Sequence, residues 1–163
     1  MSDVQEPVSD KIFTMLTRDE GVQRMPYDDA TGVPVRAPKG FLTIGVGHNL
    51  DSKPLSNAVI YQILSEDVAV ATATAKDVVG IEVWDGLTEN RKLALINLAF
   101  SMKPQSLRSF KKMLSAIRRS DWPAAGQELR ESLWAKQVDP KCQPNQGRDD
   151  RVINLLEKDQ YDY

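Results

Sequence analysis

One apolar segment near the middle of the chain most constrains the fold. Between Arg91 and Met102 the chain reads RKLALINLAFSM, so that apolar residues cover nearly every side of a helix built from this segment. A helix that is apolar all round has to be surrounded by other elements. The sequence therefore predicts a central buried helix, with Asn97 as its polar exception.

The segments around this helix alternate in character. A 3.6-residue apolar period predicts amphipathic helices that run from about Ile12 to Gly21, from Ser56 towards Val79, from Ser106 to Ile117, from Asp121 through Leu129, Leu133 and Trp134, and around Val152 to Leu156. Between Met25 and Leu50 that period is lost, and proline and glycine separate short β-prone pieces. This stretch predicts a small antiparallel sheet with tight turns. The fold class is therefore α+β and mostly helical.

Composition limits the partners and cofactors. The 163 residues carry a formal net charge of −2, with one Cys and one His, so neither an intrachain disulfide nor a zinc site of the usual Cys/His kind is expected. We expect no metal and no cofactor. The segment from Lys103 to Arg151 holds eleven Lys/Arg against six Asp/Glu, which indicates a solvated helix surface or, alternatively, a surface that steers the protein towards an anionic polymer. No interleaved aromatic residues accompany its basic clusters, so a nucleic-acid partner is not expected.

Two acidic residues near the N-terminus stand out as candidates for chemistry. Glu20 is expected at the C-terminal end of the first helix, next to Gly21, where the negative end of the helix dipole disfavours ionisation. Asp28 and Asp29 follow after a turn, and their order alone does not decide between them. A carboxylic acid and a carboxylate held apart by a short turn are what acid/base cleavage of an acetal requires.

An ordered set of motifs resembles a known family. Its members are Glu20-Gly21, Tyr27, Asp29 and Gly32, then Thr43-Ile44-Gly45-Val46-Gly47-His48, Leu64 to Ala69, Val83-Trp84-Asp85, Ala94-Leu95-Ile96-Asn97, Phe110, Trp122, Ser132, Trp134, Arg148 and Arg151-Val152-Ile153. This set, from about Ile12 to Leu156, resembles the phage-type lysozymes of the T-even phage kind, glycoside hydrolase family 24. The resemblance implies one lysozyme-like domain with two lobes: a small β-containing lobe at about 22–70, a helical lobe at about 9–21 and 81–163, and a long connecting helix at about 56–79.

The resemblance also implies an activity and roles for individual residues. The protein would be a muramidase (endolysin) that hydrolyses the β-1,4 bond between N-acetylmuramic acid and N-acetylglucosamine. Glu20 would be the general acid, Asp29 the second carboxylate, and Thr43 the hydroxyl beside the attacking water. Phe100 would line the saccharide groove. If the two carboxyl groups stand roughly 6.5–9.5 Å apart, inversion of the anomeric centre is expected.

Four further residues are expected to support the site. Arg148 falls where the family has an arginine beside the acid. His48, the only imidazole, is a tempting general base, but the family's histidine at this position pairs structurally with an aspartate on the connecting helix, here Asp67. Asn97 either lies under the saccharide groove or fills a polar gap in the core, and the sequence does not decide between the two.

Partners and setting follow from the same resemblance. The expected partner is bacterial peptidoglycan, and the protein is expected to be a monomer without stable membrane insertion, because no apolar run of signal or membrane-span length is present. It would reside in the host cytoplasm and act on the cell wall during phage-induced host lysis, after release by a separate holin-type protein. A lytic transglycosylase or a non-catalytic wall-binding module on the same fold remains an alternative.

The chain departs from the T-even pattern in two segments. The part between Gly32 and Thr43 is several residues longer, and an extra loop from Asp139 to Gln146 precedes Arg148. Several groove positions also differ, with Asn49, Met113 and Glu128 in place of the family's residues. Individual sugar contacts are therefore not carried over.

Overall fold

The computed structural model describes residues 10–27, 33–35, 40–138 and 147–163 of the chain. Its elements are α1 (Asp10–Glu20), β1 (Thr43–Ile44), β2 (His48–Asn49), α2 (Asn57–Val79), α3 (Ile81–Asp85), α4 (Glu89–Ser101), α5 (Pro104–Arg108), α6 (Lys111–Arg118), α7 (Trp122–Arg130), α8 (Leu133–Val138) and α9 (Arg148–Glu157). Within these ranges helices dominate and the sheet has two strands, which confirms the predicted mostly helical α+β class.

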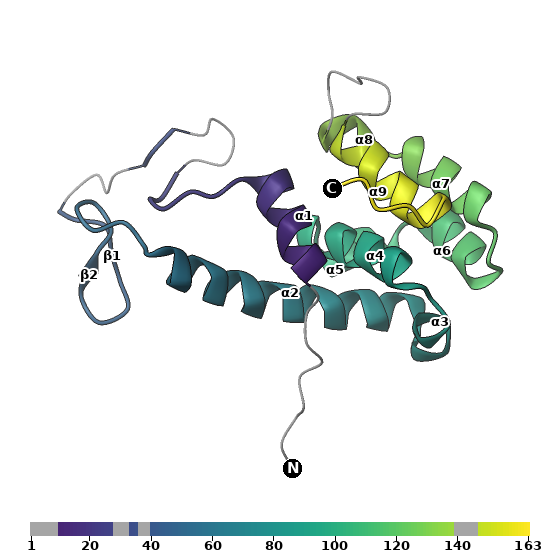
Figure 1. Ribbon diagram of the computed structural model, residues 1–163, viewed down its shortest axis with the longest axis horizontal. Helices are drawn as coiled ribbons and strands as arrows, with labels where there is room; N and C mark the ends of the chain where they lie inside the picture. Colours follow the sequence, from purple (N-terminus) through teal and green to yellow (C-terminus); the bar gives the residue numbers. More distant parts are fainter. Residues whose placement is uncertain (1–9, 28–32, 36–39, 139–146) are drawn as a thin grey trace, which may run out of the picture.

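The core is built around α4, as the apolar segment predicted. Every residue from Leu93 to Ala99 is buried, including Asn97. Helices α1, α2, α5 and α9 all pack against α4, and α7 packs in turn on α6 and α9 (Figure 1). The first and last helices of the chain therefore meet at the central helix. This arrangement decides where the candidate site forms.

The long helix α2 joins the helical part to the small sheet. Its N-cap is Ser56, whose hydroxyl accepts a hydrogen bond from the Val59 amide at 3.3 Å, and it ends at Gly80, which has φ +91°. The predicted helix from Ser56 towards Val79 is therefore present. Strands β1 and β2 lie beyond the N-terminal end of α2 (Figure 1) and pair antiparallel, with Thr43 opposite Asn49 and Ile44 opposite His48.

Two details of the helical part differ from the sequence prediction. The single helix expected from Ser106 is divided into α5 and α6, because Phe110, between them, has φ −75° and ψ 51°. Leu133 was expected to point inward but is 74% exposed. The helix expected from Asp121 ends at Arg130 and α8 starts afresh at Leu133, so the 3.6-residue phase is not maintained across the break.

A close contact between α7 and α9 gives a test of the packing. Gly126 is buried, and a Cβ atom added there would lie 2.8 Å from the Cβ of Glu157. Alanine normally stabilises a helix interior relative to glycine, by about 1 kcal/mol. Here we expect Gly126→Ala to lower the free energy of unfolding by about 1–3 kcal/mol, because the two helices would have to move apart. Urea unfolding measures the change, and an increase in stability would show that α7 and α9 are packed less closely.

Candidate active site

Glu20 is the last residue of α1, as predicted. Gly21 follows with φ +74°, and its amide donates to the Thr17 carbonyl at 3.0 Å, so the chain leaves the helix directly after the acid. The Glu20 side chain is 40% exposed, and its Oε1 lies 2.7 Å from Nη2 of Arg148 on α9. The expected arginine beside the candidate acid is therefore present.

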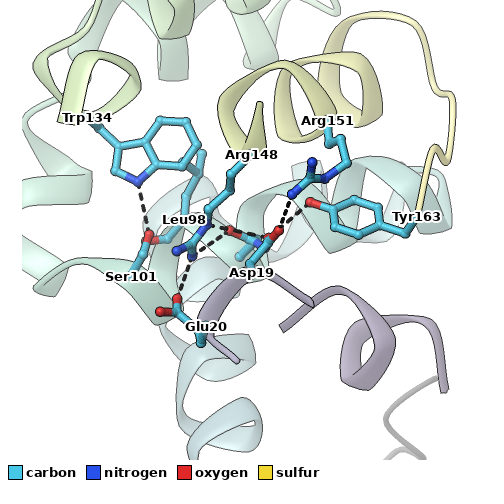
Figure 2. A network of polar contacts seen from close by, with 9 residues as sticks. Asp19, Glu20, Leu98, Ser101, Trp134, Arg148, Arg151 and Tyr163 are labelled. Carbon is cyan, nitrogen blue, oxygen red and sulfur yellow. Dashed lines mark hydrogen bonds and ion pairs between the residues drawn. The ribbon is translucent and has the colours of Figure 1, made fainter. Parts of the chain in front are cut away.

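A pocket of ≈ 510 Å³ opens beside Glu20. Its walls are the C-terminal half of α1, the N-terminal half of α2, the end of α4 and helix α8. Four residues predicted for the site or its support line it together: Glu20, Asp67, Phe100 and Arg148. Ser101 and Trp134 also line the pocket, and the Trp134 indole N–H donates to the Ser101 hydroxyl at 3.1 Å (Figure 2). The pocket thus places a carboxylic acid and a cation against apolar and aromatic surfaces.

Sequence analysis missed the residue that holds this arrangement together. The Asp19 side chain is fully buried between α1, α4 and α9. Its Oδ1 accepts a hydrogen bond from Nη2 of Arg151 at 2.7 Å, and its Oδ2 accepts one from the Tyr163 hydroxyl at 3.1 Å (Figure 2). Nε of Arg148 lies 3.4 Å from the same Oδ2. Two features of the sequence could have indicated this network. Asp19 is an acidic residue next to Glu20, and Arg148 and Arg151 lie three positions apart on one face of a helix.

Asn97 lies directly under this network. Its amide N–H donates to Asp19 Oδ2 at 2.9 Å, and its carbonyl oxygen accepts from Nη2 of Arg148 at 3.2 Å. Asn97 is fully buried, does not line the pocket of Glu20, and links α4 to Asp19 and Arg148. Arg148 is held by Asn97 and Asp19 on one side and presents the same Nη2 to Glu20.

Because Tyr163 is buried, the stability of the folded protein is expected to vary with pH in the alkaline range. Burial raises the pKa of the Tyr163 hydroxyl well above its ordinary value of 10.0, and the neighbouring charge of Asp19 raises it further. Burial likewise raises the pKa of Tyr161. An unfolded tyrosine loses its proton near pH 10.0, whereas folded Tyr163 keeps it. The contribution of the protonated Tyr163 hydroxyl to the free energy of unfolding is therefore complete below pH 10 and is lost as the pH rises above it.

We expect Tyr163→Phe to reveal this dependence. At neutral pH the variant loses the hydrogen bond to Asp19 and about 1 kcal/mol of stability. Above pH 10 the wild-type free energy of unfolding carries an extra decline of up to about 1.4 kcal/mol per pH unit from this one group, which the variant lacks. Urea unfolding of both proteins across this pH range measures the difference. Parallel pH profiles would contradict the assignment, and the slope that remains in the variant includes Tyr161.

The remaining predicted residues lie elsewhere or are not described. Asp29 lies outside the described residues. Thr43 is exposed on β1, its hydroxyl donates to the Phe41 carbonyl at 3.1 Å, and it does not line the pocket of Glu20. The ring Nε2–H of His48 donates to the Lys53 carbonyl at 2.9 Å.

The expected ion pair between His48 and Asp67 is not formed. Among the described residues, His48 has the Lys53 carbonyl as its partner, and Asp67 lines the pocket instead. The connection after β2 brings the Lys53 carbonyl within hydrogen-bond distance of His48, whereas Asp67 lies ten residues into α2.

Neither a metal-ligand cluster nor a membrane-spanning helix occurs in the described part of the chain. No group of three or more His, Cys, Asp or Glu side chains is placed to hold a metal ion there. Within the same ranges, no helix combines the length and the apolar character needed to cross a membrane.

One family model and several known proteins are similar to this chain. A family model described as phage lysozyme matches residues 17–149. The pre-baseplate central spike protein Gp5 of Enterobacteria phage T4 is 29% identical over 168 aligned residues, which cover 87% of this chain but only 27% of that protein. Two proteins of Dictyostelium discoideum, probable T4-type lysozymes 1 and 2, are 27% and 28% identical; the alignments cover 90% and 88% of this chain and 93% and 91% of theirs.

The fold, the site and these similarities define the class as a glycosidase of the lysozyme type, an enzyme that hydrolyses peptidoglycan. The family match covers most of the chain, including α1 with Glu20 and the start of α9 with Arg148. The protein belongs to the phage lysozyme family.

Proposed function

We propose that the protein hydrolyses the β-1,4 bond between N-acetylmuramic acid and N-acetylglucosamine of peptidoglycan, with Glu20 as the general acid. The observation that carries this proposal is the position of Glu20 at the end of α1, partly exposed to a pocket of ≈ 510 Å³ and fixed by Arg148 at 2.7 Å. A pocket of this volume accommodates sugar rings on both sides of a scissile bond.

Glu20 must be neutral when it protonates the leaving oxygen, yet the Arg148 guanidinium lies 2.7 Å from its carboxyl group. A nearby positive charge favours the ionised carboxylate. Arg148 also faces Asp19, which is fully buried, so that its charge is shared between two carboxylates. The C-terminal end of α1 places the negative end of a helix dipole beside Glu20. Arg148 then serves chiefly to orient the Glu20 carboxyl towards the bond.

The second half of the mechanism is assigned to Asp29 and Thr43. An ionised Asp29 would activate water, or stabilise the positive charge that develops on the sugar ring, and the Thr43 hydroxyl would hold the water. Thr43 lies outside the pocket of Glu20. In our proposal the small lobe with β1 therefore approaches the pocket when substrate binds, as lobes that close over a substrate do in other enzymes.

Product analysis tests the reaction. We expect digestion of purified peptidoglycan to release fragments with reducing N-acetylmuramic acid ends, because water is the acceptor. Mass spectrometry that finds 1,6-anhydro ends instead would identify a lytic transglycosylase and overturn hydrolysis. Anomeric detection during the first turnovers then shows whether the configuration is inverted, the outcome expected for a water-sized gap between the two carboxyl groups.

The biological setting is part of the same proposal. We place the protein as a monomeric endolysin in the host cytoplasm that reaches the cell wall through a separate membrane-permeabilising protein. Similarity to two proteins named T4-type lysozymes, over 93% and 91% of their lengths, supports the endolysin part of this proposal. Expression in a bacterial host with and without a holin is the test, and lysis without the holin would contradict this placement.

A further inference from the structure

The α2 wall of the pocket has the composition of a binding surface. Ile60, Tyr61, Ile63 and Leu64 line the pocket opposite Glu20, and Tyr61 and Ile63 are 42% and 45% exposed. Amphipathic helices usually turn such residues towards a core. A contiguous exposed apolar surface inside a pocket indicates contact with a ligand.

Tyr61 is the aromatic residue on this wall. Its ring contacts the edge of Phe13 on α1, with centroids 6.5 Å apart and planes at 62°. In the described part of the chain its hydroxyl has no hydrogen-bond partner. Three other aromatic residues line the pocket: Phe100 packs against the core, Trp134 is 6% exposed, and Tyr27, in the segment after α1, is 44% exposed. Tyr61 is therefore held from one side and accessible from the pocket.

We propose that Tyr61 is a saccharide-binding residue that stacks against a sugar ring of the glycan strand next to the scissile bond. A β-linked pyranose carries its substituents around the ring edge and presents C–H groups on its faces. An aromatic ring offers a large, rigid apolar surface with a partial negative charge on its face, which attracts such C–H groups. The inference rests on the proposed function, because it assumes that a glycan strand occupies the pocket of Glu20.

Binding measurements test Tyr61 separately from the chemistry. The probe is a soluble peptidoglycan fragment of two disaccharide units, titrated by calorimetry into Glu20→Gln protein so that it is not cleaved. Adding Tyr61→Leu, which keeps apolar volume against Phe13 but removes the aromatic ring, is expected to raise Kd about three- to tenfold. Tyr61→Phe keeps the ring and is expected to bind within about twofold of the parent. Val59→Ala is the matched control, since Val59 is 45% exposed on α2 but does not line the pocket.

Kinetics supply a second readout. In the otherwise wild-type enzyme, Tyr61→Leu is expected to raise KM with little change in kcat, which is the signature of binding energy realised equally in the ground and transition states. A purely structural role would instead lower the unfolding midpoint and leave KM unchanged in the folded protein. Rescue of KM by Tyr61→Phe further separates the two roles.

The outcomes distinguish this inference from the proposed function. If Glu20→Gln binds the fragment equally well with and without Tyr61→Leu, or does not bind it at all, the role of Tyr61 is overturned. If Glu20→Gln retains full activity, the catalytic role of Glu20 fails, whereas weaker binding by Tyr61→Leu would still support sugar stacking.

Discussion

Glu20→Gln is expected to lower kcat on peptidoglycan by about 10²–10⁴-fold, the usual contribution of a general acid. Glutamine has nearly the same shape and can still accept a hydrogen bond from Arg148, which lies 2.7 Å from the Glu20 carboxylate. It has no acidic proton to give to the leaving oxygen. The loss therefore reports on the chemical step rather than on collapse of the site.

Loss of turbidity of permeabilised Gram-negative cells measures this effect, together with kcat on purified peptidoglycan. Glu66→Gln is the matched control, because Glu66 is an exposed carboxylate on α2 that bonds Gln62 at 3.1 Å and does not line the pocket. The control is expected to clear cells like the wild type. Equal clearing by Glu20→Gln would remove Glu20 from the catalytic machinery.

Asp19→Asn is expected to lower the free energy of unfolding by about 3–5 kcal/mol, the range for breaking a buried ion pair from one side. The Asp19 side chain is fully buried, and the side chains of Arg148 and Arg151 are each only 12% exposed. Asp19→Asn removes the buried charge that both guanidinium groups share and leaves Glu20 as a charged partner of Arg148. Activity should fall as well, because Arg148 loses one of the groups that orient it towards Glu20.

Urea unfolding followed by circular dichroism provides the measurement. Asp77→Asn is the control: Asp77 pairs with Arg108, but the two side chains are 65% and 46% exposed, so a loss of about 0–1 kcal/mol is expected. If the two substitutions cost the same, the Asp19 network contributes no more than an ordinary surface pair.

Structural features that depend on the local residue pattern could be predicted from the sequence. The apolar run in α4 requires burial wherever it packs, and the Glu20–Gly21 step predicts a helix end from backbone preferences alone. Leu133 shows the limit of this approach. A periodic pattern does not reveal that a helix stops and restarts, and so the predicted inward residue lies on the surface.

The polar part of the site could not be predicted, because it depends on tertiary placement. Asp19 looks like any acidic residue near a helix end, and its burial results from α9 and the segment after it packing over α1. The His48–Asp67 pair was expected by analogy with relatives. Here the connection between β2 and α2 provides the nearer Lys53 carbonyl. Hydrogen-bond partners of this kind depend on a few ångströms of backbone position, which residue type does not encode.

The distance in sequence between the partners of the site has a consequence for synthesis. Glu20 and Asp19 are translated early, but the arginines that position and balance them come from α9, near the other end of the chain. Contacts between residues so far apart form late in folding, because a long loop must close first. We therefore expect the nascent chain to lack an ordered active site until α9 has emerged from the ribosome, so that wall-cleaving activity begins only after α9 has been synthesised.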